Sequence, residues 1–475
     1  MIKLLGIILL LSIWHSFLFF EKSLGISVIL FVLPLLILII GVLRREGKIK
    51  NKYGLLLGIP IIMLSCIYFI YDNWFFRLTN VIVIPGLFFL MYVLTVKPVY
   101  RLSDYIKDIF SFVVEPFSYV FNVIETIGDI FSKKLKLSEQ VKKRIKSFII
   151  ILPIILVVLW LLASADMVFE HAIDGIFQII RDFFNGFLDG SFVRRIIRII
   201  IVFFVISAMI YFLIYDYSVH SREENKLDNK KRDVDTIKML FIILNIIYVV
   251  FDFIQIKSLM LHSVSEEIHY ASYARQGFFQ LMIVSVINLT LILVSKKYMV
   301  NTNSKQGKFL KIMSLVMVGL TFIIIMSSFL RMNLYEQQYG YTLLRLLVYI
   351  SLITEVILMV PTIIYIIKPK YNVMVAYIVI ILGVYVLINY INVDKMIVVR
   401  NVERYCDKED IDLAYLMNNG TDNLEVLVDF YDEIDDEEIK GDLEEYFSEI
   451  EIEMNGFQEY NISKDKGREL LEKYQ

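Results

Sequence analysis

The stretch Glu266-Glu-Ile-His-Tyr-Ala-Ser-Tyr-Ala-Arg-Gln-Gly-Phe-Phe-Gln280 runs into a long apolar segment, 281–294, without a proline or a loop signal between them. A polar, aromatic turn of helix that continues into such a segment is typical of a helix end at a bilayer surface. The stretch therefore predicts a membrane-spanning helix that begins at one surface. Two other polar segments, 164–169 and 331–342, are expected on the same surface.

The composition identifies the class of protein. Of the 475 residues 57% are apolar, whereas globular domains have roughly 45–50%. The apolar residues form repeated blocks of roughly 20, the length that crosses about 30 Å of hydrocarbon at about 1.5 Å per residue. These blocks do not alternate between polar and apolar residues, which excludes a membrane β-barrel. The expected fold class is all-α: a polytopic transmembrane helical bundle with a small soluble helical tail.

Lysine and arginine residues mark alternate connections between the blocks. The cationic connection 44–52 is expected in the cytoplasm, and the N-terminus with it. Over the chain, 28 Lys and Arg residues lie on the assigned inside and 10 on the outside, leaving out the tail and Lys238. An odd number of spans then puts the tail on the outer face. The eleven predicted spans are 4–20, 24–43, 53–71, 78–96, 147–165, 196–215, 237–256, 277–295, 309–330, 344–367 and 373–391.

Four regions follow from this pattern. Residues 1–97 form an N-terminal four-span region, and residues 98–146 are expected to form amphipathic helices on the inner membrane surface, broken near Pro116. Residues 147–391 form a seven-span core, and 392–475 form an acidic soluble tail. Within the core, the pattern over 167–189 predicts an interfacial helix on the outer surface.

The tail is strongly acidic and has helical periodicity. Residues 392–475 contain 25 acidic and 9 basic residues, a net charge of −16, which leaves +14 on the rest because the whole chain is −2. A helix at 410–416, a turn at 418–421 and the sequence Asp422-Asn-Leu-Glu425 predict a helix–turn–helix with a cap-like start. A third helical pattern follows Gly441-Asp442. We interpret the acidity as a solvated face rather than an ion site.

Motifs of nucleotide-binding proteins and hydrolases are absent from the sequence. It contains no G-x-x-x-x-G-K-[ST], G-x-S-x-G, H-E-x-x-H or paired C-x-x-C. Two cysteines, Cys66 and Cys406, make no disulfide framework and no zinc spacing. His262 and His269 are seven residues apart, about 10 Å along a helix, too far to share a metal without further ligands. We expect no metal, no cofactor and no nucleic-acid partner; the expected surroundings are the lipid bilayer.

Ionisable residues at membrane depth are the default candidates for function, because burying them in lipid is costly. Glu355 lies near the middle of the tenth span, Asp252 one turn from the outer end of the seventh, and Asp166 at the end of the fifth. One hypothesis is a polar cavity open to the outside with Glu355 as a proton or cation relay. The other is structural: Asp166 and Asp252 form interhelical salt bridges with outer-surface arginines, and Glu355 is protonated and hydrogen-bonded. The arginines are Arg275, Arg331 and Arg345.

Aromatic residues accompany these charges. Tyr270, Tyr273, Gly277 and Gln280 share one helix face, beside small residues that permit close helix approach. This pattern favours packing more than chemistry. The full candidate intramembrane or outer-face polar site comprises Asp166, Asp252, Tyr270, Tyr273, Arg275, Arg331, Tyr335, Tyr339, Arg345 and Glu355.

Several of these segments resemble the signature blocks of a bacterial polytopic membrane family. The blocks are Leu162-Ala-Ser-Ala-Asp-Met-Val-Phe169, 270–279, 331–335 with 339–345, and Asn392-Val-Asp with 412–416. The family is the domain-of-unknown-function group numbered four-one-seven-three and four-one-five-three. The resemblance covers residues 147–430 in matching order and leaves the first 145 residues and the acidic end outside. It implies a bacterial plasma-membrane protein and supplies no activity, substrate or catalytic residue.

Three functions remain open. The leading hypothesis is a non-enzymatic membrane protein whose outward-facing motifs and tail form one structural unit for sensing, scaffolding or envelope assembly through a membrane or envelope partner. The alternative is a secondary transporter or proton-coupled permease that uses Glu355 and Asp252, although no internal repeat supports it. The third is an enzyme acting on lipid or a lipid-linked sugar with Asp166 as base, for which the sequence supplies neither nucleophile nor metal.

Overall fold

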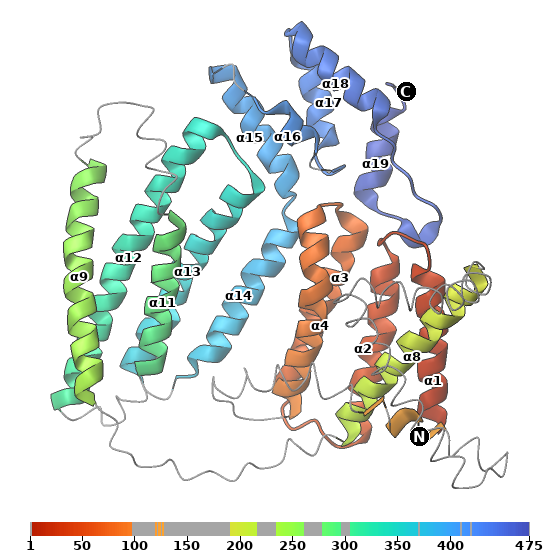
Figure 1. The fold of residues 1–475 in the computed structure, drawn as a ribbon, viewed down its shortest axis with the longest axis horizontal. Coiled ribbons are helices and arrows are strands. Elements are labelled where there is room, and N and C mark those ends of the chain that lie inside the picture. The colour runs from red at the N-terminus through yellow and green to blue at the C-terminus, as the bar shows by residue number, and fades with distance from the viewer. Residues whose placement is uncertain are drawn as a thin grey trace, which may run out of the picture. The chain divides into compact units, whose positions relative to one another are not determined.

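The structure is a computed structural model, and all its regular elements are helices in the part of the chain that it describes (Figure 1). The described residues are 2–96, 119–120, 122–124, 126–127, 191–215, 234–260, 278–295, 305–368, 371–408, 411–418 and 420–474. The predicted span 147–165 and interfacial helix 167–189 lie outside these residues, as does most of 98–146.

Two compact units divide the chain, and each takes in segments that are distant in sequence. Unit 1 comprises residues 1–70, 78–222 and 453–461; unit 2 comprises 71–77, 223–452 and 462–475. The loop 71–77 thus belongs with the C-terminal half of the chain. Conversely, segment 453–461 of the tail belongs with the N-terminal helices.

In the part that the structure describes, unit 1 is built on two helical hairpins and an additional long helix. Arg198 donates to the Phe19 carbonyl at 2.8 Å, and Lys48 donates to the carbonyls of Leu213 and Ile214 at 2.7 and 2.8 Å. The Arg198 contact ties the start of one helix to the end of another, and the Lys48 contacts tie a connecting loop to a helix end. Both satisfy carbonyls that a helix C-terminus leaves open. The helices are α1 (Ile2–Phe19), α2 (Ser27–Arg45), the 3-10 helix η1 (Lys52–Leu57), α3 (Gly58–Ile70), α4 (Trp74–Val96, of which Leu78 onward lies in unit 1) and α8 (Ser191–Tyr215).

Unit 2 contains a layer of five long helices in which α12 packs against α9, α11 and α13, and α13 packs against α14. Their bounds are α9 (Val234–Met260), α11 (Phe278–Ser295), α12 (Lys305–Tyr339), α13 (Leu343–Ile367) and α14 (Val373–Tyr390). Proline 361 lies inside α13. The buried apolar cluster of this layer runs from Phe241 in α9 to Ile366 in α13.

The tail helices pack at the end of unit 2 where α12 ends and α13 begins (Figure 1). They surround their own apolar core, in which Leu427, Leu443 and Phe447 are fully buried. The three helices expected from sequence are confirmed as α16 (Leu413–Met417), α17 (Leu424–Glu433) and α18 (Glu437–Glu449). Helices α15 (Val393–Lys408) and α19 (Ile462–Leu471) complete the tail, and the 3-10 helix η3 (Phe457–Glu459) lies in the unit 1 segment.

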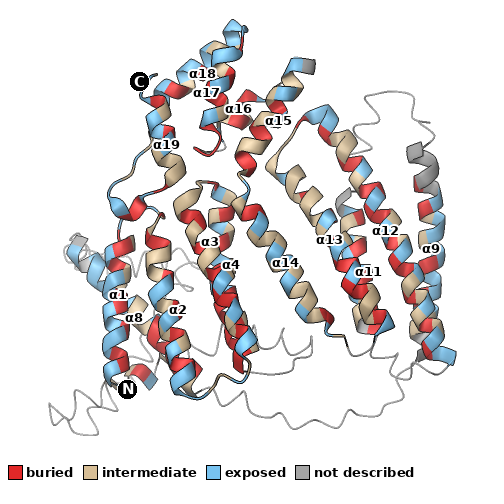
Figure 2. Cartoon of the chain, turned by 180° about the vertical axis from the view of Figure 1, so that it is seen from behind, coloured by how far each residue is buried: buried red, intermediate tan, exposed pale blue. Residues whose placement is uncertain are grey.

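Eight described helices are long and apolar enough to cross a membrane, and they coincide with eight of the predicted spans. The predicted span 277–295 corresponds to the shorter apolar helix 280–293 within α11, and 237–256 lies within α9. Along α1 and α9, buried and exposed residues alternate (Figure 2), and the exposed ones include large apolar side chains such as Leu10 and Ile246. Apolar side chains around a helix are expected where lipid covers it. The count of eleven spans stays a prediction.

Candidate functional site

The turn between α12 and α13 is held by one side chain of the tail. Asn401 of α15 accepts a hydrogen bond from the Tyr341 N–H at 3.0 Å and donates to the Tyr341 carbonyl at 2.9 Å. Gly340 has φ +77, and a Cβ there would lie 2.5 Å from Asn401 Oδ1. Only glycine adopts this conformation readily. The tail and the turn are therefore fitted to each other at backbone level.

Two further contacts complete the ends of these helices. The Arg404 guanidinium donates to the Gln338 carbonyl at 2.8 Å, at the C-terminus of α12, where cations are favoured. The hydroxyl of Tyr415 accepts from the Leu343 N–H at 2.9 Å, at the start of α13, where Thr342 provides no side-chain cap. Side chains of α15 and α16 thus satisfy orphan groups of two membrane helices.

The loop 71–77 is anchored in unit 2 by an aromatic residue and an amide. Phe76 is buried with Ile388 and Val393. Asn73 accepts from the Phe76 N–H at 3.0 Å and donates to the Asp394 carboxylate at 2.7 Å. Burial raises the pKa of Asp394 to about 7, although the Asn73 hydrogen bond lowers it.

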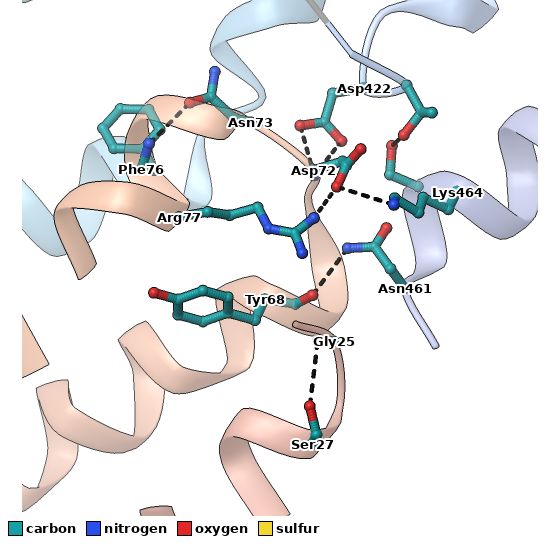
Figure 3. Close-up of polar contacts among 12 residues, drawn as sticks. Gly25, Ser27, Tyr68, Asp72, Asn73, Phe76, Arg77, Asp422, Asn461 and Lys464 are labelled. Carbon is teal, nitrogen blue, oxygen red and sulfur yellow. Dashed lines mark hydrogen bonds and ion pairs between the residues drawn. The ribbon is translucent and has the colours of Figure 1, made fainter. Parts of the chain in front are cut away.

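A second tail carboxylate also meets this loop, as Figure 3 shows. The Asp72 N–H lies 2.8 and 2.9 Å from the two carboxylate oxygens of Asp422. The Asp72 carboxylate in turn pairs with Arg77 and lies 3.9 Å from the Lys464 ammonium. Burial raises the pKa of Asp422 to about 6, although the hydrogen bond from Ser463 and the charge of Arg77 lower it.

These contacts refine the interpretation of the acidic tail. The sequence predicted Asp422 at the start of a capped helix, but the N-cap of α17 is Asn423, which makes no side-chain cap. Asp422 instead receives the backbone of the 71–77 loop. Two of the tail's carboxylates, Asp394 and Asp422, are therefore buried structural groups, whereas residues such as Glu444 and Glu445 are exposed as expected.

Unit 1 has a corresponding contact with its own tail segment, 453–461. The Ile26 N–H donates to the Tyr460 carbonyl at 3.0 Å, and Asn461 donates to the Tyr68 carbonyl at 3.0 Å (Figure 3). A Cβ on Gly25 would lie 2.5 Å from the backbone carbon of Glu459. Burial alone would raise the pKa of Glu459, but backbone hydrogen bonds from Asn455 and Ser23 and the charge of Lys22 lower it overall.

Three predicted site residues gather near the α12–α13 turn. The Arg345 guanidinium lies 4.5 Å from the ring centre of Tyr335 and 6.0 Å from that of Tyr339. It also donates to the Tyr339 carbonyl at 2.8 Å and to that of Gly340. The aromatic and cationic residues of this motif therefore brace the turn that Asn401 binds.

The other predicted site residues lie at membrane depth or outside the described part. Arg331 donates to Gln255 at 2.7 Å, while neither oxygen of Asp252 has a hydrogen-bond partner among the residues that the structure describes. Glu355 is hydrogen-bonded to Ser285. Asp166, Tyr270, Tyr273 and Arg275 lie outside the described residues. Within the described residues, no group of three or more His, Cys, Asp or Glu side chains could hold a metal ion.

Sequence reasoning missed the residues that make the tail junction, namely Asn73, Asn401 and the buried Asp394 and Asp422. For Asp394 a signal existed, since Asn392-Val-Asp394 is one of the motif blocks: Asn392 caps α15 and donates to the Asp422 carbonyl at 2.8 Å. For Asn73 there was none, because its partner is 321 residues away in sequence.

Fold and site together define a multi-pass helical membrane protein with a C-terminal helical domain built onto the ends of its membrane helices. A family model described as "Domain of unknown function (DUF4153)" matches residues 58–430, and the chain belongs to this family. The match begins earlier than the motif blocks indicated, so it takes in α3, α4 and the 71–77 loop as well. No curated protein and no solved structure matches the chain.

Proposed function

We propose that the protein is a non-enzymatic scaffold or sensor of the bacterial plasma membrane. Its N-terminus is cytoplasmic, and its tail and polar motifs face outward. The tail domain presents a surface to an envelope or membrane-protein partner. The observation that carries the proposal is the paired hydrogen bond between Asn401 and the Tyr341 backbone, because it makes the tail and the 331–345 motif one structural unit.

Further support comes from where the motif blocks meet. The described parts of three blocks, 339–345, 392–394 and 412–416, contact one another or the 71–77 loop through specific side chains. A flexible tethered tail would not require such fitted contacts at helix ends. Residues devoted to holding the tail in one position favour a function that depends on that position.

In vivo crosslinking tests the proposal. A photo-crosslinking amino acid replaces the exposed Glu445 of α18 in the full-length chain, expressed in its native cells. In the otherwise wild-type protein we expect a discrete crosslinked protein or envelope component. Asn401→Ala should reduce that product at least several-fold while the chain stays in the membrane. Arg400→Ala is the matched control, since Arg400 is exposed and pairs with Glu403 on the same helix.

Two outcomes contradict the proposal: crosslinking to lipid alone, or an equal product from the Asn401→Ala protein. If Asn401→Ala prevents accumulation in the membrane, Gly340→Ala serves in its place, because it disturbs the same contact from the other side.

The second candidate is a proton-coupled permease. It is favoured by one observation: Asp252 and one oxygen of Glu355 are buried within the helical layer and have no hydrogen-bond partner among the described residues. A strain that lacks the gene should then recover its growth phenotype with the wild-type gene but not with the Glu355→Gln gene. Full complementation by a stable Glu355→Gln protein would count against this function.

A further inference from the structure

A polar stripe runs along one face of helix α9, whose middle, 239–256, is otherwise apolar. Its members are Asn245, Tyr248, Asp252 and Gln255, at spacings of three, four and three residues, which place them on one side of a helix. Asn245 donates to the Met313 carbonyl at 3.0 Å, and Gln255 accepts from Ser327 at 3.0 Å. The stripe therefore faces α12 within unit 2 rather than lipid.

The stripe continues through α11 into α12. The Tyr248 hydroxyl donates to Asn288 Oδ1 at 2.7 Å, and Asn288 Nδ2 donates to Thr321 Oγ1 at 3.0 Å. Ser285 lies one turn before Asn288 on α11 and is fully buried. Ser285 in turn contacts Glu355 of α13, so polar groups connect four helices of the layer.

The single hydroxyl proton of Ser285 constrains the protonation state of the Glu355 carboxyl. The serine hydroxyl is placed to donate both to the Met282 carbonyl at 2.7 Å, which can only accept, and to Glu355 Oε2. A serine carries a single hydroxyl proton. If that proton is donated to Met282, the second hydrogen bond needs a proton on the carboxyl of Glu355.

The surroundings of Glu355 favour the same state. The side chain is 4% exposed, and its Oε1 has no hydrogen-bond partner within the described ranges. On the helices of the layer, the described charged side chains away from the inner ends are Asp252, Arg331, Glu336 and Arg345, and Glu355 makes no ion pair in the part of the chain that the structure describes. An ionised carboxylate with a single donor would be costly in a membrane interior.

We propose that Glu355 is a proton-binding site in the membrane-embedded core of unit 2. The carboxyl carries an exchangeable proton, which it donates to Ser285, and Ser285 donates its own proton to the Met282 carbonyl. Asp252 is a second protonated carboxyl, which differs by having no hydrogen-bond partner in the described part of the chain. The ligand is the proton itself, and the site does not depend on any protein partner of the tail.

Infrared difference spectroscopy of the full-length protein in lipid at neutral pH tests this assignment. A protonated carboxyl gives a carbonyl band well separated from carboxylate bands. We expect this band from the wild type, its loss in Glu355→Gln, and its shift when the membranes are transferred to D₂O. A separate band should be lost in Asp252→Asn.

Ser285→Ala provides the sharper test, because it keeps the carboxyl and removes only its partner. It should move the Glu355 band in frequency. Ser295→Ala is the matched control: Ser295 is also buried on α11 and bonds its i−3 carbonyl at 2.8 Å, but it touches no carboxyl. Identical wild-type and Glu355→Gln spectra in this region, or a band that does not shift in D₂O, would overturn the proposal.

Discussion

The tail is held in the two units by different physical means. In unit 2, helices α15–α19 enclose an apolar core that includes Leu427 and Phe447, and buried carboxylates fix the 71–77 loop. In unit 1, segment 453–461 is held by separate contacts with the N-terminal helices. They include backbone contacts at Gly25 and Ile26, hydrogen bonds from Ser23 to Glu459 and from Asn461 to the Tyr68 carbonyl, and the packing of the Phe457 ring against Phe17. We infer that the unit 2 part of the tail has its own folding energy, whereas the unit 1 segment depends on its contacts with the N-terminal helices and the turn between α1 and α2.

The largest expected difference in unfolding free energy comes from replacing a phenylalanine by alanine in each of the two regions. Phe447 is 0% exposed in the unit 2 tail core, and Phe457 is 53% exposed in the unit 1 segment. Phe447→Ala should destabilise the tail by about 3–5 kcal/mol, because it removes a buried ring and leaves a cavity. Phe457→Ala should cost under about 1 kcal/mol. Urea titration of membrane-bound protein followed by pulse proteolysis measures both, and similar midpoints would contradict the comparison.

The buried carboxylates should give the unit 2 tail a pH-dependent stability. The folded pKa of Asp394, about 7, lies above the unfolded value of 3.8, so the folded state binds the proton more tightly. The corresponding stabilisation is fully present below pH 3.8 and is lost as the pH rises through about 7. Asp422, whose pKa is about 6, acts in the same direction.

Asp394→Asn should flatten this dependence, because asparagine stays neutral at every pH. Between about pH 4 and pH 7 we expect the wild-type tail to lose stability on the order of 3–4 kcal/mol through Asp394. The exposed Asp442→Asn is the control and should keep the wild-type slope. Proteolysis midpoints in urea across this pH range give the slopes, and a tail that grows more stable towards neutral pH would contradict the account.

A smaller effect is expected from a substitution that disturbs only the contact of segment 453–461 in unit 1. Gly25→Ala places a methyl group against the Glu459 backbone, whereas Gly41→Ala on α2 meets nothing within 4 Å. We expect Gly25→Ala to cost about 1–3 kcal/mol through overpacking and to increase hydrogen exchange in 453–461 while α17 stays protected. Gly41→Ala should leave exchange unchanged. Equal exchange in the two variants would show that the close approach does not hold the segment.

Much of the fold followed from the sequence because hydrophobic blocks of bilayer length leave few alternatives. Eight spans and the three tail helices appear close to their expected places. Local patterns decide such elements, since periodicity and capping involve residues within a few turns of one another.

The contacts that join the tail to the α12–α13 turn and to the 71–77 loop could not be predicted from local patterns. The paired residues of the junction are far apart in sequence, as Asn73 is from Asp394 and Tyr341 is from Asn401. A single asparagine shows no sequence pattern that predicts its hydrogen-bond partner. The division of the tail between units was equally hidden, because it involves contacts between residues distant in sequence, such as Gly25 with Glu459. Glu355 was recognisable as a membrane carboxyl, but its Ser285 partner required the packing of α11 against α13.

The native cysteines provide the most direct test of the central claim, that the tail shares the outer face with the polar motifs. Cys406 on α15 is exposed, whereas Cys66 lies within α3. A membrane-impermeant maleimide added to intact cells should label the wild-type protein, and Cys406→Ser should abolish labelling. Lys50→Cys in that background, in a connection that the proposed topology places in the cytoplasm, should react only after the membrane is opened. Labelling of Cys406 that requires permeabilised membranes would contradict the claim.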